Sequence, residues 1–209
     1  MPLEIKTFVL GPIENNTYLL FDPTSKDALI IDPSFDIDAV TGFMQDFDLS
    51  LSQIWLTHAH FDHFYGIFDL RKNFPDVKIS LHPADLFLWE QGGLGSIYNL
   101  KLDITFPPDI LLNEDHQLFF GSYLFKVFHT PGHSPGHVSF YNASSGCAFV
   151  GDLIFKENIG RTDLPGGSTD TILQSIRQKI LPLPPDTILY PGHGPATSVK
   201  EEIRNNPYI

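Results

Sequence analysis

The sequence predicts an α/β protein (α+β, four layers) in which two mixed β-sheets lie face to face and helices cover them from outside. Two observations predict this architecture: strand-like apolar runs occur in two blocks along the chain, and helical patterns follow each block. Each sheet needs a second layer to bury its apolar face, and this arrangement supplies one. No linker or internal repeat is visible, so residues 1–209 are expected to form one domain.

The first block begins with short strands that are bounded by turn residues such as Gly11-Pro12 and Asn15-Asn16. Asp36 is expected to cap a helix that runs to about Phe47, because apolar residues recur there at helical spacing. The expected elements are strands 3–10, 17–22 and 28–32, helix 36–47, strand 53–57, helix 63–73, strand 77–81 and helix 84–91. Residues 92–108 lack clear periodicity and are predicted to form a long loop of the kind that often covers a site.

The second block repeats the order of strands followed by helices. Its longest helix is expected to begin at a cap formed by Ser168 or Thr169. The expected elements are strands 117–120, 123–128, 137–141, 147–151 and 153–155, helix 169–180, strand 187–190 and a last helix 196–205.

Composition narrows the classes of function. Thirteen basic and 25 acidic residues give a formal charge of −12, which repels phosphate backbones and anionic lipid, so we expect neither nucleic acid nor a membrane as a partner. Cys147 is the only cysteine, which excludes an intrachain disulfide. We see no signal peptide, and no apolar run approaches the roughly 18 residues of a membrane span, so a cytoplasmic protein is expected.

Three histidines and an aspartate follow the expected strand 53–57 within six positions. They are His58, His60, Asp62 and His63. Histidine is the commonest metal ligand, and carboxylate beside imidazole suits zinc, iron or manganese. The spacing of His58 and His60 lets both rings reach one ion from an extended turn, after which Asp62 and His63 point onward to a second. The segment therefore predicts a metal site.

Three later segments repeat the order of a strand, a potential ligand and a glycine or proline turn. They contain His133, Asp152 and His193. Strand ends meet at one edge of a sheet, so these side chains can approach residues 58–63, and seven donors suit two ions bridged by a carboxylate and a hydroxide. Asp152 could instead cap a turn, and His133 and His193 could be ordinary histidines. Ordinary roles are also expected for three more histidines: His82, His116 and His129.

Together these motifs resemble the metallo-β-lactamase fold superfamily, whose signature His-X-His-X-Asp-His stands here at residues 58–63. The resemblance extends from the first strands to residue 193 and implies an αββα sandwich with the site at one edge of the sheets. It also implies the ligands of each ion: His58, His60 and His133 for the first, Asp62, His63 and His193 for the second, and Asp152 as the bridge. Two divalent ions are expected, most simply zinc, although iron or manganese would also suit these donors.

Carbonyl hydrolysis follows from such a site. Two ions lower the pKa of a bridging water, one polarises the substrate carbonyl, and both stabilise the anionic tetrahedral intermediate. Asp62 can ligate an ion and also orient the hydroxide. No serine or cysteine nucleophile is needed, and Cys147 lies within an apolar strand, where a structural role is expected.

Within the superfamily, the chain resembles compact bacterial glyoxalase II-like hydrolases, thioesterases that act on S-acyl-glutathione. Residues 133–137, His-Ser-Pro-Gly-His, are similar to that branch's His-Thr-X-Gly-His element, in which the second histidine is not a ligand. His137 is thus expected to support the ligands, unless it is a strand histidine that faces solvent. Arg161 stands where the family contacts the carboxylate of the thiol carrier, although it could instead pair with Asp163. The sixteen residues after His193 resemble the short tail of the compact members.

Two further classes of function stay open. The segment Gly160-Arg161-Thr162-Asp163 is also found in the superfamily's persulfide dioxygenases, which bind one iron through two histidines and an aspartate. The chain could also be a non-catalytic member that binds metal or a partner, but such members usually lose ligands, and all seven are present. Class B β-lactamases fit less well because they are secreted. The native thioester, its thiol carrier and the oligomeric state are left open.

Overall fold

The computed structural model describes residues 3–209, which form two compact units. The N-terminal unit comprises the chain up to Leu81 and Leu86–Leu111, and the C-terminal unit comprises His82–Asp85 and Leu112–Ile209. Each unit contains one six-stranded sheet with parallel and antiparallel neighbours. Two mixed sheets with flanking helices are the predicted fold class, which is confirmed. That the chain is one domain stays a prediction.

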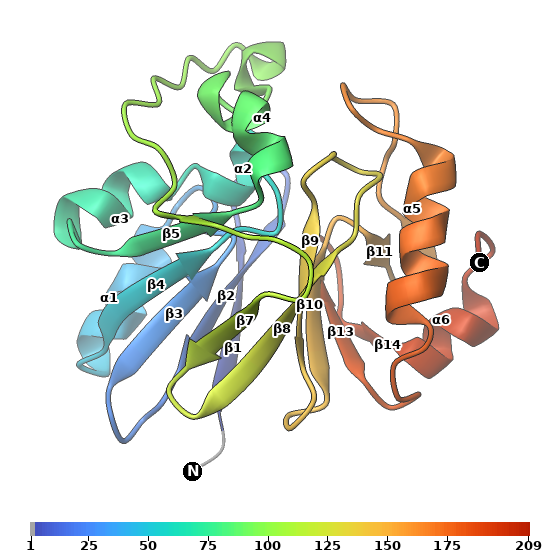
Figure 1. Ribbon diagram of the computed structural model, residues 1–209. Helices are drawn as coiled ribbons and strands as arrows, with labels where there is room; N and C mark the ends of the chain where they lie inside the picture. Colours follow the sequence, from blue (N-terminus) through green and yellow to red (C-terminus); the bar gives the residue numbers. More distant parts are fainter. Residues whose placement is uncertain (1–2) are drawn as a thin grey trace. The chain divides into compact units, whose positions relative to one another are not determined.

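In the N-terminal unit the strands follow one another in chain order across the sheet (Figure 1). They are β1 Glu4–Leu10, β2 Asn15–Phe21, β3 Asp27–Ile31, β4 Ser50–Trp55, β5 Lys78–Leu81 and β6 Ile110–Leu111. Strands β3 to β6 are parallel, so β3 and β4 end at the same edge. Helices α1 (Asp38–Asp46) and α3 (Ile67–Asn73) pack on this sheet through Val40, Met44, Ile67 and Leu70.

In the C-terminal unit the sheet has the strand order β14-β13-β10-β9-β8-β7. The strands are β7 Gln117–Phe120, β8 Tyr123–His129, β9 Val138–Asn142, β10 Cys147–Gly151, β13 Ile188–Pro191 and β14 Thr197–Ser198. A small hairpin pairs β11 (Ile154–Phe155) with β12 (Asn158–Ile159). Helices α5 (Thr169–Ser175) and α6 (Val199–Asn205) lie beside this sheet (Figure 1), and their residues Ile172 and Val199 share one buried cluster with Ala148 of β10 and Leu189 of β13.

Several predicted boundaries are corrected by the structure. Asp36 does not cap α1: its φ is +52°, and the helix begins at Asp38 after Ile37, without a side-chain cap. The predicted helix 63–73 is two helices, α2 (Phe61–Phe64) and α3: Gly66, which lies between them, donates its N–H to the carbonyl of Pro33 at 3.0 Å and not to a carbonyl of the preceding turn. The predicted strand 53–57 is β4, which ends at Trp55.

The cap of the long C-terminal helix is predicted correctly. The hydroxyl of Ser168 accepts the N–H of Thr171 at 3.3 Å, and α5 then continues as the π-helical segment η3 (Ile176–Ile180). The predicted short helix 84–91 is the 3-10 turn η1 (Pro83–Asp85) followed by α4 (Leu86–Glu90). The loop 92–108 contains one 3-10 turn, η2 (Gly95–Tyr98). The predicted last helix 196–205 begins later, because residues 197–198 form the strand β14 and α6 starts at Val199 after the cap Ser198. The two-residue strands β6 and β12 were not predicted, because elements so short have no periodicity.

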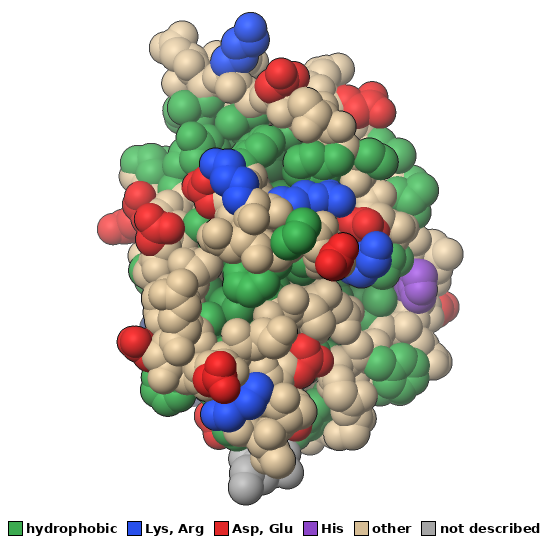
Figure 2. Space-filling view, turned by 90° about the vertical axis from the view of Figure 1, so that its left-hand side faces the viewer, with side chains coloured by type: hydrophobic (Ala, Val, Ile, Leu, Met, Phe, Trp, Pro, Cys, Tyr) green, Lys and Arg blue, Asp and Glu red, His purple; other side chains and the backbone are tan. Residues whose placement is uncertain are grey.

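The surface shows no segregation of charge on the face drawn in Figure 2, where acidic and basic side chains of the described residues are interspersed. Within residues 3–209, no helix combines the length and the apolar character that a membrane crossing requires. The expectations of a cytoplasmic location and of no nucleic-acid partner stay predictions.

Candidate metal centre

Four of the predicted donors lie after the carboxyl end of β4. His60 has an extended backbone (φ −83°, ψ 145°) directly before α2, whose single turn contains Asp62 and His63. All four side chains are buried. The ring centroids of His60 and His63 lie 4.7 and 4.1 Å from the centroid of His58. The N-terminal unit alone therefore gathers three imidazoles and a carboxylate away from solvent.

The ring of His58 is oriented by hydrogen bonds that begin at Asp32. Thr57 donates its backbone N–H at 2.8 Å and its hydroxyl at 2.6 Å to the Asp32 carboxylate. Since the hydroxyl proton of Thr57 is used there, its oxygen accepts the Nδ1–H of His58, at 3.1 Å. When this ring is neutral, the lone pair is on Nε2, the atom that a metal ion would bind.

Asp32 orients His63 in the same way. Its Oδ2 accepts the Nδ1–H of His63 at 3.0 Å, which leaves the lone pair on Nε2. That Nε2 lies 3.1 Å from Nδ2 of Asn15, so an ion bound to His63 would replace this hydrogen bond. The role of Asp32 was not predicted from the sequence. The signal was available, because an aspartate directly after an apolar strand is the pattern that singled out Asp152.

Two histidines of the C-terminal unit lie around the carboxylate of Asp152, which is the third donor of this unit. His133 follows β8, Asp152 follows β10 and His193 follows β13. Oδ2 of Asp152 lies 3.5 Å from Nε2 of His133 and 3.7 Å from Nε2 of His193. These separations are too long for good hydrogen bonds. They are close to the roughly 3.4 Å between two donors that each lie about 2.1 Å from one tetrahedral ion.

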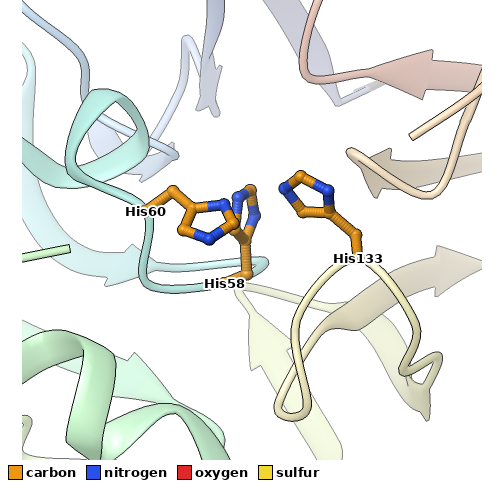
Figure 3. Close-up of side chains that lie close together, drawn as sticks. All are labelled: His58, His60 and His133. Carbon is orange, nitrogen blue, oxygen red and sulfur yellow. The ribbon is translucent and has the colours of Figure 1, made fainter. Parts of the chain in front are cut away.

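The seven donors form three groups of three residues. Within each group, the ligand atoms all lie within 4.8 Å of one another. These groups are His58, His60 and His133; His58, His63 and Asp152; and Asp62, His63 and His193. Figure 3 shows the first group, in which the three rings turn towards one another. Imidazole and carboxylate donors fit zinc, iron or manganese. Groups of histidine and aspartate that can hold two divalent ions are therefore present, and all of their members except the partly exposed His193 are buried.

His137 supports the backbone next to a donor. Its side chain is fully buried, which does not fit a solvent-facing strand histidine. Its Nε2 accepts the backbone N–H of Asp152 at 3.1 Å, so Nδ1 carries the proton and donates to the hydroxyl of Thr130 at 3.0 Å. The Thr130 hydroxyl in turn lies 3.0 Å from the hydroxyl of Ser139. This buried network defines one tautomer of His137.

Arg161 contributes through its backbone and through its side chain. Its carbonyl oxygen accepts the Nδ1–H of His133 at 2.8 Å, so Nε2 of that ring faces the carboxylate of Asp152. Its exposed guanidinium forms two hydrogen bonds with Asp163, of 2.7 and 2.8 Å. These bonds lower the pKa of Asp163 to about 2. The ion pair with Asp163, which the sequence allowed as a second role for Arg161, is present.

The backbone can adopt this path before Arg161 only because residue 160 is glycine. A Cβ at Gly160 would collide with the backbone carbonyl oxygen of Asp152. The close approach of these two backbones therefore places Arg161 beside the ring of His133.

Two of the three histidines with expected ordinary roles stack on each other. The rings of His82 and His129 lie 4.2 Å apart at an angle of 9°. Burial, and secondly the neighbouring His129, lower the pKa of His82 to about 4. Among the described residues, none of the donor groups includes His82, His116 or His129.

Comparison with known proteins places these observations in a family context. The model of the family described as "Metallo-beta-lactamase superfamily" matches residues 10–193. The chain is 33% identical over 209 residues to hydroxyacylglutathione hydrolase GloC of Haemophilus influenzae, and the match covers 99% of this chain and 98% of that protein.

Two solved structures are similar along almost the whole chain. The BLEG-1 B3 metallo-beta-lactamase has a TM-score of 0.89 and 38% identity, over 98% of this chain and 99% of that one. TTHA1623 in a di-iron-bound form has a TM-score of 0.87 and 38% identity, over 98% of this chain and 100% of that one. The likeness therefore includes both the fold and the full length.

Proposed function

The chain belongs to the metallo-beta-lactamase superfamily, and on this premise we propose that it is a metal-dependent hydrolase that cleaves a thioester of the S-acyl-glutathione type. One observation carries the proposal: all seven donors fall into groups of the size that divalent ions need, and every donor except the partly exposed His193 is buried. The full-length similarity to a hydroxyacylglutathione hydrolase supports the choice of substrate. The di-iron form of TTHA1623 supports two ions and leaves their identity open between zinc, iron and manganese.

The proposed ligands divide into two sets and a bridge. His58, His60 and His133 would hold the first ion, and Asp62, His63 and His193 the second, which matches two of the donor groups. Asp152 would bridge them, a role supported by the similar distances from its Oδ2 to His133 and His193. When bound, such ions lower the pKa of a water molecule and polarise the carbonyl of the substrate.

The protein's own residues have three tasks in this reaction. Asp32 and Arg161 keep the Nδ1 protons of His63 and His133 in place, so that both rings present Nε2. Asp62 accepts a hydrogen bond from the attacking water and orients it towards the carbonyl carbon. The guanidinium of Arg161 binds a carboxylate of the thiol carrier, for which it must share or release Asp163.

A β-lactam is the second candidate substrate, because the similar BLEG-1 structure is that of a B3 metallo-beta-lactamase. Hydrolysis of a thioester and of a β-lactam both pass through an anionic tetrahedral intermediate, so the same kind of site can stabilise the intermediate of either reaction. A persulfide dioxygenase with one iron and a non-catalytic metal-binding member would each use fewer donors than the seven present.

A substrate panel tests the proposal. Zinc-loaded protein and a matched chelator-treated sample are assayed on S-lactoylglutathione, a lactone, a β-lactam and glutathione persulfide. We expect loss of the thioester absorbance in the loaded sample alone, with activity restored when zinc is returned. If the protein hydrolyses the β-lactam but not the thioester, or takes up oxygen on the persulfide, the proposed substrate is wrong. No turnover on any compound would favour a non-catalytic protein.

A further inference from the structure

A buried carboxylate outside the seven donors holds the loop that carries His133. Asp85 is the last residue of the turn η1, and its side chain is fully buried. Its Oδ2 accepts the hydroxyl of Ser134 at 2.7 Å, and its Oδ1 accepts the backbone N–H of Gly136 at 2.6 Å. Burying a carboxylate is costly unless strong hydrogen bonds compensate, and here both oxygens bind the same short loop.

The two hydrogen bonds hold a segment that lies between two functional histidines. Ser134 directly follows His133, and Gly136 directly precedes His137. A Cβ at residue 136 would lie 2.6 Å from the backbone nitrogen of Asp85 and 2.7 Å from its Cγ, so glycine is required for this approach. The backbone from His133 to His137 is therefore held against Asp85.

Both histidines connect this loop to the proposed ligands. The ring of His133 is tied to the carbonyl of Arg161 at 2.8 Å, so a shift of its backbone would turn Nε2 away from Asp152. His137 accepts the backbone N–H of Asp152 at 3.1 Å. One loop thus positions a ligand of the first ion and supports the proposed bridge.

We propose that Asp85 is a positioning residue of the metal site, which acts on His133 and Asp152 through the loop 133–137. This inference rests on the proposed function only in taking His133 and Asp152 as ligands. It predicts that removal of the Asp85 carboxylate weakens metal binding although all seven donors remain.

Zinc affinity measured by competition with a chromogenic chelator tests this role. Asp85→Asn should weaken the affinity by about 10- to 100-fold, the usual effect of changing a group that orients a metal ligand. Ser134→Ala removes one of the two hydrogen bonds and should weaken it less. The double variant should bind no more weakly than Asp85→Asn, because both changes act on the same contact. The milder serine variant keeps the test informative if Asp85→Asn folds poorly.

Glu202→Gln is the matched control. Glu202 is a fully buried carboxylate of the same unit, and it accepts hydrogen bonds from the backbone of Glu157 and the amide of Asn206, both at 2.9 Å. The Glu202→Gln variant should lower the melting temperature of the metal-free protein, as Asp85→Asn should, but its zinc affinity should equal that of the wild type. If Asp85→Asn binds zinc like the wild type, or if both variants weaken zinc binding equally, Asp85 is only structural and the proposal is wrong.

The proposed function and this inference can fail separately. A wild-type protein that binds two zinc ions but hydrolyses no thioester would overturn the substrate, while the zinc affinities of the variants would still decide the role of Asp85. A His133→Ala variant with wild-type affinity for both ions would show that His133 is not a ligand. That result would overturn the positioning role even if the thioester is hydrolysed.

Discussion

The Nδ1 atom of His63 lies 3.0 Å from Oδ2 of Asp32, and both side chains are almost completely buried. The same carboxylate accepts two hydrogen bonds from Thr57, whose hydroxyl accepts the Nδ1–H of His58. Asp32 therefore supports two proposed ligands of different ions without being a ligand itself. Such a partner fixes the tautomer of an imidazole and raises its basicity towards a metal.

Replacing Asp32 with alanine should destabilise the metal-free protein. The backbone N–H and hydroxyl of Thr57 and the Nδ1–H of His63 would lose their acceptor inside the protein. We expect the free energy of unfolding in urea to fall by about 3–5 kcal/mol. The control Asp69→Ala removes an exposed pair with Lys72 and should cost at most about 1 kcal/mol. Equal effects of the two variants would contradict the supporting role of Asp32.

Replacing Asp152 with alanine should reduce metal content and activity together. A bridging ligand serves both ions, so elemental analysis should give clearly less metal per chain than in the wild type. The rate of thioester hydrolysis should fall by more than about 100-fold, the upper range for a group that only orients a ligand. Asp163→Ala, an exposed aspartate of the same unit, should keep its metal. Full activity and metal content in Asp152→Ala would exclude the bridging role.

Replacing Arg161 with alanine should change substrate binding more than chemistry. A lost charge-assisted hydrogen bond costs about 1.5–3 kcal/mol, which corresponds to a KM for S-lactoylglutathione about 10- to 100-fold higher. The KM of a thioester whose thiol carries no carboxylate should not change. Arg161→Lys keeps the positive charge but loses the planar guanidinium. Its KM for S-lactoylglutathione should lie between those of the wild type and of Arg161→Ala. Equal effects on both thioesters would show that Arg161 does not bind a carboxylate.

The pair of Arg161 and Asp163 makes a prediction about pH. Hydrogen bonds from Arg161 lower the pKa of Asp163 to about 2 from its ordinary 3.8. A lowered carboxyl pKa means that the pair is fully formed above the ordinary value and is lost only as the pH falls towards 2. The KM should therefore show no inflection from Asp163 near neutral pH. Asp163→Asn should release Arg161 and lower the KM for S-lactoylglutathione; a higher KM would show that the pair itself orients the arginine for substrate.

Cys147 should be inert in the folded protein. Burial raises its thiol pKa to about 11, and the thiolate is the reactive form. A thiol reagent at neutral pH should neither label the native protein nor reduce its thioesterase activity. The unfolded chain should react with one equivalent, since this is the only cysteine. Rapid labelling of the native protein, with loss of activity, would contradict the structural role.

Much of the candidate site was predictable because its signals are local. Residues 58–63 are adjacent in sequence, and each distant donor follows an apolar strand and precedes a tight turn. Within the C-terminal unit, β10 and β13 are parallel neighbours that end at the same edge of the sheet, which explains why Asp152 and His193 can approach each other. The cap at Ser168 is equally local, since the hydroxyl and the N–H that it accepts are three residues apart.

The supporting residues depend on contacts that no local pattern encodes. Asp32 reaches Thr57 because β3 and β4 are parallel neighbours. Asp85 reaches Ser134 and Gly136 although about fifty positions separate them in the chain. Asp36 shows the opposite case: its residue type favours a helix cap, but its backbone conformation places the helix start two residues later.

Titration of metal-free protein with zinc, while thioester hydrolysis is followed, tests the central claim most directly. We predict that activity rises with bound zinc and reaches its maximum close to two ions per chain. Maximal activity of the metal-free protein would contradict this claim. So would a protein that holds a single iron and consumes oxygen on glutathione persulfide but leaves S-lactoylglutathione intact.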